Sequence, residues 1–301
     1  SVTLSLSDMD PVLGFSQLRS DDNITGSLQQ SFSQSSPPDA STLKSLTPGA
    51  GKSGSTFVQT SDMKFILKAV GSSEVENLRK LMQGGPKVSP LRQHFLRENK
   101  NSLLNRYYGA YRVNLFHHTW DYILMDDAKH GLRMNTQLAD NTKTLSGCHM
   151  LTYDLKGASR SATSKHWTSR NCGSRPHTGA CRVKKTGING DFGEVEKNRL
   201  HLTTQQCATY KKALQADTKL LEQHKLIDYS LLITRQTGCP TQCRATPLCL
   251  ASSKPGTNYA LSVIDYLIRF GAKKKAESII KGGKFGNYGR KIDTFFASIC
   301  P

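Results

Sequence analysis

The amino-acid sequence predicts a mixed α+β fold built on antiparallel β-sheet, and two kinds of pattern carry this prediction. Short apolar runs of strand length are separated by polar turns, and the clearest hairpin pattern joins residues 57–59 to 64–70. A longer segment, residues 204–225, has the apolar periodicity of an amphipathic helix, with one face formed by Cys207, Tyr210, Leu214 and Leu221. The 301 residues are enough for one large domain or for two lobes.

The remaining elements follow from the same patterns in chain order. Residues 26–48 are rich in Ser, Gln, Pro and Thr, and this composition predicts a mobile loop. A polar connection of the kind that joins two lobes begins at Asp126 and Asp127, and residues 157–190 have a loop-like Ser, Arg, Lys and Gly composition. We expect helices over residues 74–82 and 90–98, and strands over residues 107–115, 122–125, 150–155, 229–234 and 259–265.

The charge of the chain favours anionic partners. Lysine and arginine number 41 against 23 aspartate and glutamate residues, which gives a formal net charge of +18. A nucleotide, a nucleic acid or an acidic membrane surface would each complement this charge. No apolar stretch approaches the ~20 residues of a membrane span, and no signal-peptide pattern opens the sequence. We therefore expect an intracellular, soluble protein.

The eight cysteines are scattered and form no CxxC pair. A zinc cluster can be imagined around residues 172–181 and 239–249, but the spacings fit no standard zinc site. We expect reduced thiols in loops.

A glycine-rich segment followed by a lysine-bearing strand is the strongest local motif. Backbone N–H groups of glycines can approach anionic oxygens without a Cβ in the way, and a lysine adds a point charge beside them. Lys68 ends the apolar run 65–67 ten residues beyond Val58, which suits a strand that delivers one cation to phosphates. The candidate nucleotide-binding residues of the loop are Gly51, Lys52, Ser53 and Gly54.

Two better-known phosphate loops fit this segment less well. A Walker A loop needs a glycine five residues before Gly51, where this chain has Leu46. A Rossmann loop follows a strand and opens a helix, whereas this loop runs into Thr56-Phe57-Val58, which favours a strand. The loop is therefore more like that of a kinase, although a glycine-rich hairpin connection is the plainer alternative.

Three aspartates at predicted strand ends supply the acidic groups that phosphoryl transfer needs. Such a reaction depends on carboxylates that hold Mg²⁺ and orient the attacking hydroxyl. Asp154, Asp228 and Asp265 occupy these places. A single aspartate at a strand end is more often a cap or a surface group, but three behind a phosphate loop favour a catalytic role.

A protein kinase is one alternative interpretation. The string from Asp154 to Lys156 is like a kinase catalytic loop, and Asp191-Phe192-Gly193 spells the metal-binding triplet. However, no His-Arg pair precedes Asp154, Ser159 stands where the catalytic-loop asparagine belongs, and no Ala-Pro-Glu follows. This interpretation also leaves Asp228 and Asp265 without a role.

A series of strings in fixed order resembles the motifs of the phosphatidylinositol phosphate kinase family. The resemblance runs from about residue 49 to the end, and its most specific strings are Asp154-Leu155-Lys156-Gly157 and Asp228-Tyr229-Ser230-Leu231-Leu232. The other strings are Gly51–Ser55, Lys64–Lys68, Asn101–Leu104, Tyr108–Val113, Val263–Asp265, Lys273–Glu277 and Phe285–Phe296.

The resemblance implies an α+β, two-lobed fold that is distantly protein-kinase-like. Residues 1–126 would form an N-terminal lobe with an antiparallel sheet and the glycine-rich ATP loop. Residues 127–301 would form a C-terminal lobe with a smaller sheet, the catalytic aspartates and a basic activation segment. ATP and Mg²⁺ would be the cofactors.

The resemblance also implies roles for individual residues. Lys68 would bind the triphosphate, Asp228 would be the catalytic aspartate near the inositol hydroxyl, and Asp265 would hold Mg²⁺. Lys156 and Arg160 would contact substrate or nucleotide phosphates. The chain departs from the family at Ala158, where a serine is usual, and residues 160–190 and 235–257 show little likeness.

The basic segment 269–291 predicts membrane contact. Eight basic residues against the single acid Glu277 give +7 over 23 residues. Each basic residue near an anionic leaflet contributes roughly 1 kcal/mol, so we expect Lys273, Lys274 and Lys275 to bind the membrane. No stacking aromatics cluster as in a nucleic-acid platform, and we expect no nucleic-acid partner.

Glu277 indicates the substrate, because family members that phosphorylate the 5-hydroxyl have glutamate here and the 4-kinases have alanine. The resemblance thus implies a phosphatidylinositol 4-phosphate 5-kinase, peripheral on the cytoplasmic face of membranes and open to homodimerisation. A phosphatidylinositol 3-phosphate 5-kinase and a catalytically poor membrane-binding scaffold are the alternatives.

Overall fold

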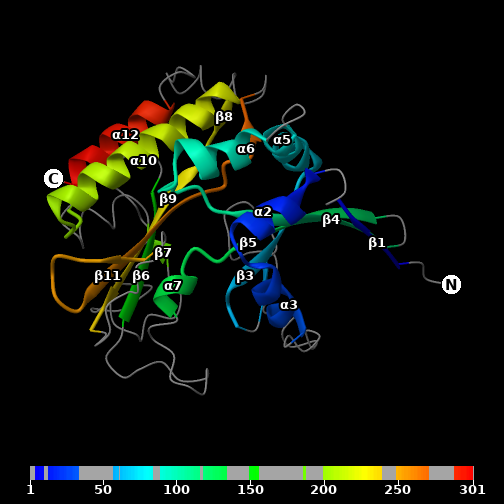
Figure 1. Ribbon diagram of the computed structural model, residues 1–301, viewed down its shortest axis with the longest axis horizontal. Coiled ribbons are helices and arrows are strands. Elements are labelled where there is room, and N and C mark those ends of the chain that lie inside the picture. The colour runs from blue at the N-terminus through cyan, green and yellow to red at the C-terminus, as the bar shows by residue number, and fades with distance from the viewer. Residues whose placement is uncertain are drawn as a thin grey trace, which may run out of the picture. The chain divides into compact units, whose positions relative to one another are not determined.

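The computed structural model describes most of the predicted elements (Figure 1). The described residues are 4–9, 13–33, 57–60, 62–83, 89–115, 118–133, 149–155, 186–187, 199–238, 249–270 and 288–300. The chain divides into two compact units. Unit 1 comprises Ser1–Gln93 and Asn105–His130, and unit 2 comprises His94–Leu104 and Gly131–Pro301. The division into functional lobes at residues 126 and 127 stays a prediction.

Unit 1 contains a five-stranded antiparallel sheet in the order β1-β4-β5-β3-β2. Its strands are β1 (Leu4–Asp8), β2 (Phe57–Gln59), β3 (Phe65–Val70), β4 (Tyr107–Leu115) and β5 (His118–Asp126). The predicted hairpin is confirmed, with Phe57 paired to Lys68. Phe65, Tyr108 and Leu124 form a buried cluster, in which the first two rings meet edge to face at 6.0 Å.

The helices of unit 1 include one that the polar composition of residues 26–48 did not predict. They are α2 (Phe15–Asp21), α3 (Thr25–Ser33), α5 (Ser72–Met82) and α6 (Pro90–Gln93). The mobile loop predicted for residues 26–48 is wrong over its first part, because α3 forms there. Ile24 and Leu28 pack against the buried cluster of the sheet, and this tertiary contact outweighs the polar composition. Residues 34–48 lie outside the described residues.

Unit 2 contains a five-stranded sheet in the order β10-β11-β9-β6-β7 and a two-stranded sheet of β12 and β8. All pairs are antiparallel except β6 with β7. The strands are β6 (His149–Leu155), β7 (Thr186–Gly187), β8 (Leu226–Ile227), β9 (Ser230–Thr237), β10 (Leu250–Ala251), β11 (Thr257–Ile264) and β12 (Ile268–Arg269). Mixed helix and antiparallel sheet, as predicted, thus describe the fold.

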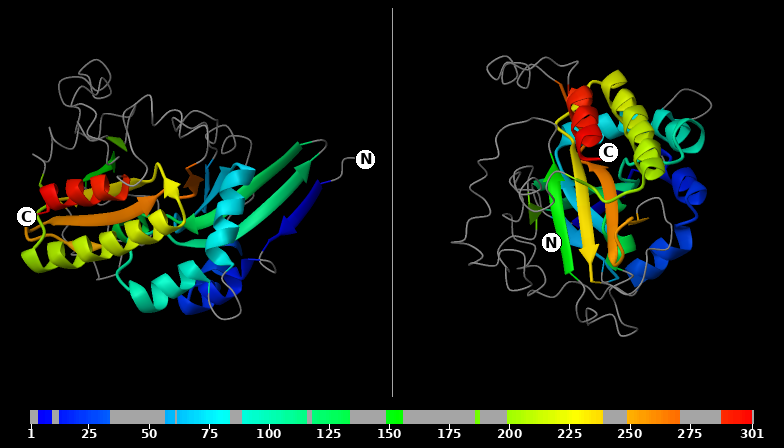
Figure 2. Two further views of the ribbon diagram at one scale, coloured as in Figure 1. Left: turned by 90° about the horizontal axis from the view of Figure 1, so that it is seen from above. Right: turned by 90° about the vertical axis from the view of Figure 1, so that its left-hand side faces the viewer.

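Two long helices of unit 2 lie side by side, α10 (Thr204–Gln223) and α12 (Tyr288–Ile299) (Figures 1 and 2). Thr203 and Gln206 form a capping box that starts α10. The predicted apolar face of α10 is buried at Cys207, Leu214 and Leu221. Across the described residues, no helix has the length and apolarity needed to cross a bilayer.

The sequence predicted reduced thiols, and this is wrong for the three described cysteines, Cys207, Cys249 and Cys300, which are all disulfide-bonded. Cys207 at the start of α10 and Cys300 just after α12 form a disulfide, with their Cα atoms 5.5 Å apart. A separation of 93 residues gives no spacing signal, and only the packing of the two helices brings the thiols together. Of the remaining cysteines, Cys148, Cys172, Cys181, Cys239 and Cys243 lie outside the described residues.

The segment predicted as one helix over residues 90–98 has two parts. The α-helix α6 ends at Gln93, and a π-helical turn, η1 (His94–Glu98), continues from it. The boundary between the two units falls at the same place. Insertions of this type are frequent at functional sites. A short α-helix, α7 (His130–Arg133), follows β5.

Candidate active site

Lys68 lies on β3 of unit 1, and its side chain is held by a carboxylate. The residue is only 7% exposed. Its Nζ lies 3.5 Å from Oε1 of Glu74 on α5. A buried ammonium group needs such a counter-charge, because desolvation disfavours the charged form. This ion pair gives the Lys68 ammonium a counter-charge within unit 1.

Glu74 is fixed by its position in the first turn of α5. The Oε2 atom of Glu74 accepts the backbone N–H of Gly71 at 3.0 Å, while Oε1 faces Lys68. The carboxylate also complements the positive end of the helix dipole. Glu74 was not among the residues predicted for the site. Its signal was a glutamate at the start of a predicted helix, directly after the strand that bears the lysine.

The glycine-rich loop itself lies outside the described residues, which include none of Gly51, Lys52, Ser53 and Gly54. The chain that follows it enters the sheet at β2, where Phe57 pairs with Lys68. The loop is therefore covalently joined to the strand next to the lysine. Protein kinases use the same order, a glycine-rich loop and then a strand with a lysine that pairs with a helix glutamate.

Two backbone ladders in unit 2 bring the segments of Asp228 and Asp265 together. Asp228 lies between β8 and β9, and Asp265 lies between β11 and β12. On one side of the two aspartates, Ser230 pairs with Ile264; on the other, Ile227 pairs with Ile268. The turn that contains Asp228 and the turn that contains Asp265 therefore lie next to each other, between the two ladders. The predicted catalytic and metal-binding aspartates share this place in the fold.

Both aspartates have left-handed backbone conformations, with φ of 66° at Asp228 and 59° at Asp265. Aspartate tolerates this region better than most residues, but it still costs roughly 1–2 kcal/mol. Strained backbone persists where the surrounding structure fixes it, and it clusters at active sites. Both side chains are partly exposed, so solutes can reach them.

The third aspartate, Asp154, lies on β6 next to β9, where it pairs with Leu232. Its Oδ1 atom is buried and accepts no hydrogen bond within the described part of the chain. A buried acceptor without a donor is costly unless a ligand or ion completes it. Asp154 therefore retains unused acceptor capacity on the strand next to β9.

The acidic residues fit Mg²⁺ bound together with a nucleotide. Within the described ranges, no three His, Cys, Asp or Glu side chains are grouped to hold a metal by themselves. Mg²⁺ commonly takes one or two carboxylates and completes its shell with water and substrate phosphates. Asp265 follows β11, and Asp154 with its open acceptor lies on β6 of the same sheet as β11, so these are the carboxylates that would hold such an ion.

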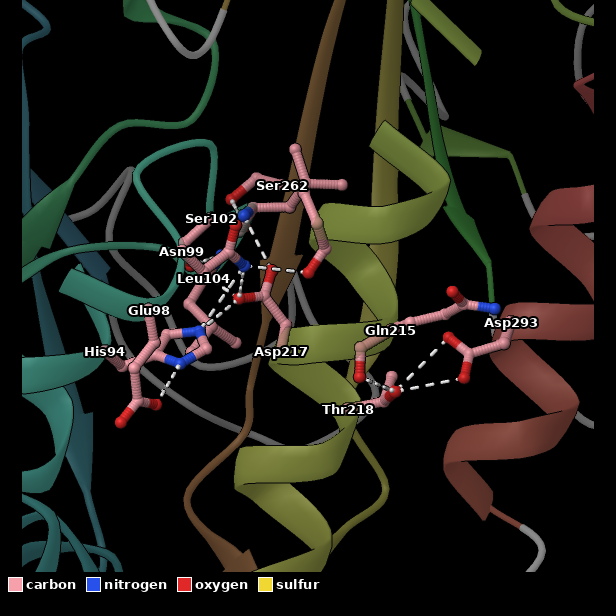
Figure 3. A network of polar contacts seen from close by, with 12 residues as sticks. His94, Glu98, Asn99, Ser102, Leu104, Gln215, Asp217, Thr218, Ser262 and Asp293 are labelled. Atoms are coloured by element: carbon pink, nitrogen blue, oxygen red, sulfur yellow. Dashed lines mark hydrogen bonds and ion pairs between the residues drawn. The ribbon is translucent and has the colours of Figure 1, made fainter. Parts of the chain in front are cut away.

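A buried carboxylate on α10 organises the segment that precedes Asn105 (Figure 3). Asp217 is fully buried, and its Oδ1 accepts hydrogen bonds from His94 Nε2 at 2.7 Å, Asn99 Nδ2 at 2.8 Å and Ser102 Oγ at 2.6 Å. Its Oδ2 accepts the backbone N–H of Leu103 at 2.7 Å. These four donors satisfy both oxygens of the carboxylate.

The same segment is joined to the strand that ends at Asp265. The carbonyl oxygen of Leu103 accepts the backbone N–H of Val263 at 2.6 Å, and Leu104 forms a parallel bridge with Val263. Val263 lies on β11, two residues before Asp265. Asp217 therefore supports the approach of β11 to the candidate site. Its signal in the sequence was an acid on the apolar face of a predicted helix, between Leu214 and Leu221.

Several predicted site residues cannot be placed, because they lie outside the described residues. They are Lys156, Arg160, Lys273, Lys274, Lys275 and Glu277. Lys68 belongs to unit 1, whereas Asp154, Asp228 and Asp265 belong to unit 2. The described residues bring Asp228 and Asp265 together and pair Lys68 with Glu74.

Comparison with known proteins identifies the family. A family model described as Phosphatidylinositol-4-phosphate 5-Kinase matches residues 39–247, more than half of the chain. The match includes Lys68, Asp154 and Asp228 and ends before Asp265. The chain belongs to this phosphatidylinositol phosphate kinase family, as its motifs predicted.

Individual relatives cover the chain unequally. Phosphatidylinositol 4-phosphate 5-kinase type-1 beta of Mus musculus is 31% identical over 185 residues, which are 61% of this chain and 28% of that protein. The type-1 enzyme sktl of Drosophila melanogaster is 31% identical over 196 residues, 64% of this chain and 20% of the relative. The 1-phosphatidylinositol 3-phosphate 5-kinase of Homo sapiens is 24% identical over 247 residues, 80% of this chain and 10% of the relative. This chain therefore spans less than a third of each relative.

Proposed function

We propose that this chain is the catalytic region of a lipid kinase that transfers the γ-phosphoryl group of ATP to the 5-hydroxyl of phosphatidylinositol 4-phosphate. The observation that carries the proposal is the pairing of the Asp228 and Asp265 segments by two adjacent ladders in unit 2. The ion pair of Lys68 with Glu74 in unit 1 supports it independently.

Each group has one role in the proposed phosphoryl transfer. The 5-hydroxyl oxygen bonds to the γ-phosphorus, the bond from that phosphorus to the β,γ-bridging oxygen breaks, and ADP leaves. Asp228 orients the hydroxyl and accepts its proton. Lys68 binds the phosphates as a fixed cation, and Asp265 is the carboxylate that holds Mg²⁺. When bound, Mg²⁺ neutralises the charge that develops on the phosphate oxygens.

The lipid substrate is proposed from Glu277 and from the activities that the names of the relatives state. The mouse relative is named a phosphatidylinositol 4-phosphate 5-kinase. The lysines at 273–275 would dock the protein on an anionic leaflet at the cytoplasmic face of a membrane, so that the headgroup can enter. A phosphatidylinositol 3-phosphate 5-kinase is the second candidate, because the human enzyme of that name matches a larger share of this chain.

A substrate panel tests the proposal. The protein is incubated with labelled ATP, Mg²⁺ and vesicles that contain the 3-, 4- or 5-monophosphate of phosphatidylinositol, and the product isomer is identified. We expect the 4,5-bisphosphate to be the main product. A 3,5-bisphosphate would support the second candidate, and no product with any lipid would leave only the scaffold alternative.

Two sets of variants separate specificity from docking in the same assay. Glu277→Ala should shift preference from the 4-phosphate towards the 5-phosphate lipid. Replacement of the lysines at 273–275 by glutamine removes about 3 kcal/mol of attraction to an anionic leaflet, which corresponds to roughly a hundredfold in binding. Activity on vesicles should then collapse while activity on a short-chain soluble lipid survives. Equal losses on both substrates would assign these lysines to the active site.

A further inference from the structure

The first residue of α12 contacts the backbone next to Asp228. The hydroxyl of Tyr288 donates a hydrogen bond to the carbonyl oxygen of Tyr229 at 2.6 Å. The two rings also meet edge to face, with centroids 4.8 Å apart. Tyr229 is buried and directly follows Asp228 in the chain. One side chain of α12 therefore binds both the ring and the peptide group of the residue after the proposed catalytic aspartate.

The start of α12 is closely packed at this point. A Cβ atom added at Gly289 would lie 3.1 Å from Cβ of Thr218 and 3.2 Å from Oη of Tyr229. The absence of a side chain at Gly289 thus allows the first turn of α12 to approach α10 and Tyr229.

One turn further along, the Oγ1 of Thr218 lies 3.0 and 3.2 Å from the two carboxylate oxygens of Asp293 (Figure 3). Cys300 is bonded to Cys207 at the opposite end of the helix. Helix α12 is thus anchored on α10 along its length, and this fixes the backbone position of Tyr288.

The phenol of Tyr288 lies within electrostatic reach of the acidic residues of the site. Burial raises the pKa of Tyr288 above its usual value, and the negative charges of Asp228 and Asp154 raise it further. The phenol therefore keeps its proton at all physiological pH values and remains a donor. Its only donor hydrogen is directed to the carbonyl oxygen of Tyr229.

We propose that Tyr288 is a positioning residue for Asp228, which it holds in place through the peptide group of Tyr229. The left-handed conformation of Asp228 needs support from its surroundings, and the buried ring and fixed carbonyl of Tyr229 supply it. A small displacement of a reacting group costs far more in rate than in stability. The catalytic part of this inference rests on the proposed function, whereas the positioning part does not.

The test compares Tyr288→Phe with Tyr210→Phe as the matched control. The first substitution keeps the ring against Tyr229 and removes only the hydroxyl. Tyr210 is a half-buried tyrosine on α10 whose pKa is raised by burial alone. Its substitution therefore removes a hydroxyl that is not coupled to the acidic residues of the site. Gly289→Ala is a second variant, which keeps the phenol group of Tyr288 but pushes the first turn of α12, and the phenol with it, away from Tyr229.

Hydrogen exchange and kinetics are then measured on the same proteins. In Tyr288→Phe we expect exchange of the backbone amides at residues 228–230 to accelerate about fivefold. We expect kcat to fall on the order of tenfold, with KM for ATP unchanged within about twofold. Gly289→Ala should change both readouts in the same direction, and Tyr210→Phe should change neither.

The outcomes separate this inference from the proposed function. Unchanged exchange at residues 228–230 in Tyr288→Phe overturns the positioning role, whatever the activity. Faster exchange with an unchanged kcat, in a protein that phosphorylates its lipid, overturns the catalytic consequence. Faster exchange in a protein with no activity on any phosphoinositide supports the positioning role and rejects the proposed function instead.

Discussion

The ammonium group of Lys68 and the carboxylate of Glu74 lie 3.5 Å apart, and the same carboxylate accepts a backbone N–H at the start of α5. Strand β3 presents the cation and the helix fixes its counter-charge. This relationship supplies the counter-charge that a lysine only 7% exposed needs.

Glu74→Gln should lower kcat/KM for ATP roughly tenfold, because the lysine loses the charge that orients it. Lys68→Met should abolish activity by removing the cation. Glu76→Gln is the matched control, since Glu76 is an exposed acid of the same helix that pairs with Arg79 and Lys80. A Glu74→Gln enzyme with the ATP kinetics of this control would contradict the role of the pair.

Asp217→Asn should destabilise unit 2. The carboxylate satisfies three donors on one oxygen and a backbone N–H on the other, and an amide replaces one of these acceptors with a donor. We expect a loss of about 1–3 kcal/mol in the free energy of unfolding, measured by urea denaturation. Lys219→Gln, an exposed change on the same helix, should have no such effect. Equal stability of the two variants would show that the network is dispensable.

The stability of unit 1 should depend on the protonation of Asp126. Burial raises the pKa of Asp126 to about 7. The phenol of Tyr108 lies 3.1 Å from Asp22 and 3.2 Å from Asp126, and its single proton can serve only one carboxylate at a time. Asp22 and Asp127 add negative charge around Asp126, whereas Arg106 opposes them.

The folded state therefore binds the proton of Asp126 more tightly than the unfolded state, in which its pKa is about 4. The stabilisation is complete below pH 4 and is lost as the pH rises to about 7, with a slope of at most about 1.4 kcal/mol per pH unit. Asp126→Asn should remove this dependence, so its stability relative to the wild type should increase between pH 4.5 and 7.5. A difference that is constant with pH would contradict the assignment.

The disulfide of Cys207 and Cys300 should stabilise the packing of α10 and α12. Closing a loop of this length restricts the unfolded chain, and we expect the double serine variant to lose about 2–5 kcal/mol. The measurement is urea denaturation with and without a thiol reductant. The denaturation midpoint of the double variant should also respond less to reductant than that of the wild type. Identical midpoints under oxidising conditions would show that the bond does not form.

Local patterns in the sequence predicted most strands, because apolar runs and turns depend only on residues that are close in the chain. The hairpin that carries Lys68, the strand that contains Asp154 and the strand after Asp228 are examples. The motifs also singled out Asp228 and Asp265, but no local pattern showed that β8 pairs with β12 and so brings them together.

The features that sequence reasoning missed depend on contacts between distant segments. Helix α3 is polar in composition and is stabilised by packing on the sheet, and Cys207 meets Cys300 only after α12 packs on α10. Asp217 and Tyr288 act on residues 114 and 59 positions away, Leu103 and Tyr229, which no local pattern could indicate. Glu74 is close to Lys68 in the chain, but only the turn from β3 into α5 brings the two side chains together.

The most direct test of the account is the activity of Asp265→Asn on vesicles with phosphatidylinositol 4-phosphate, labelled ATP and Mg²⁺. We predict that the wild type forms the 4,5-bisphosphate. The variant should lose at least roughly a hundredfold in rate, with an unchanged circular dichroism spectrum and urea midpoint. A folded Asp265→Asn protein that makes this product at near the wild-type rate would contradict the central claim that Asp228 and Asp265 form the catalytic pair.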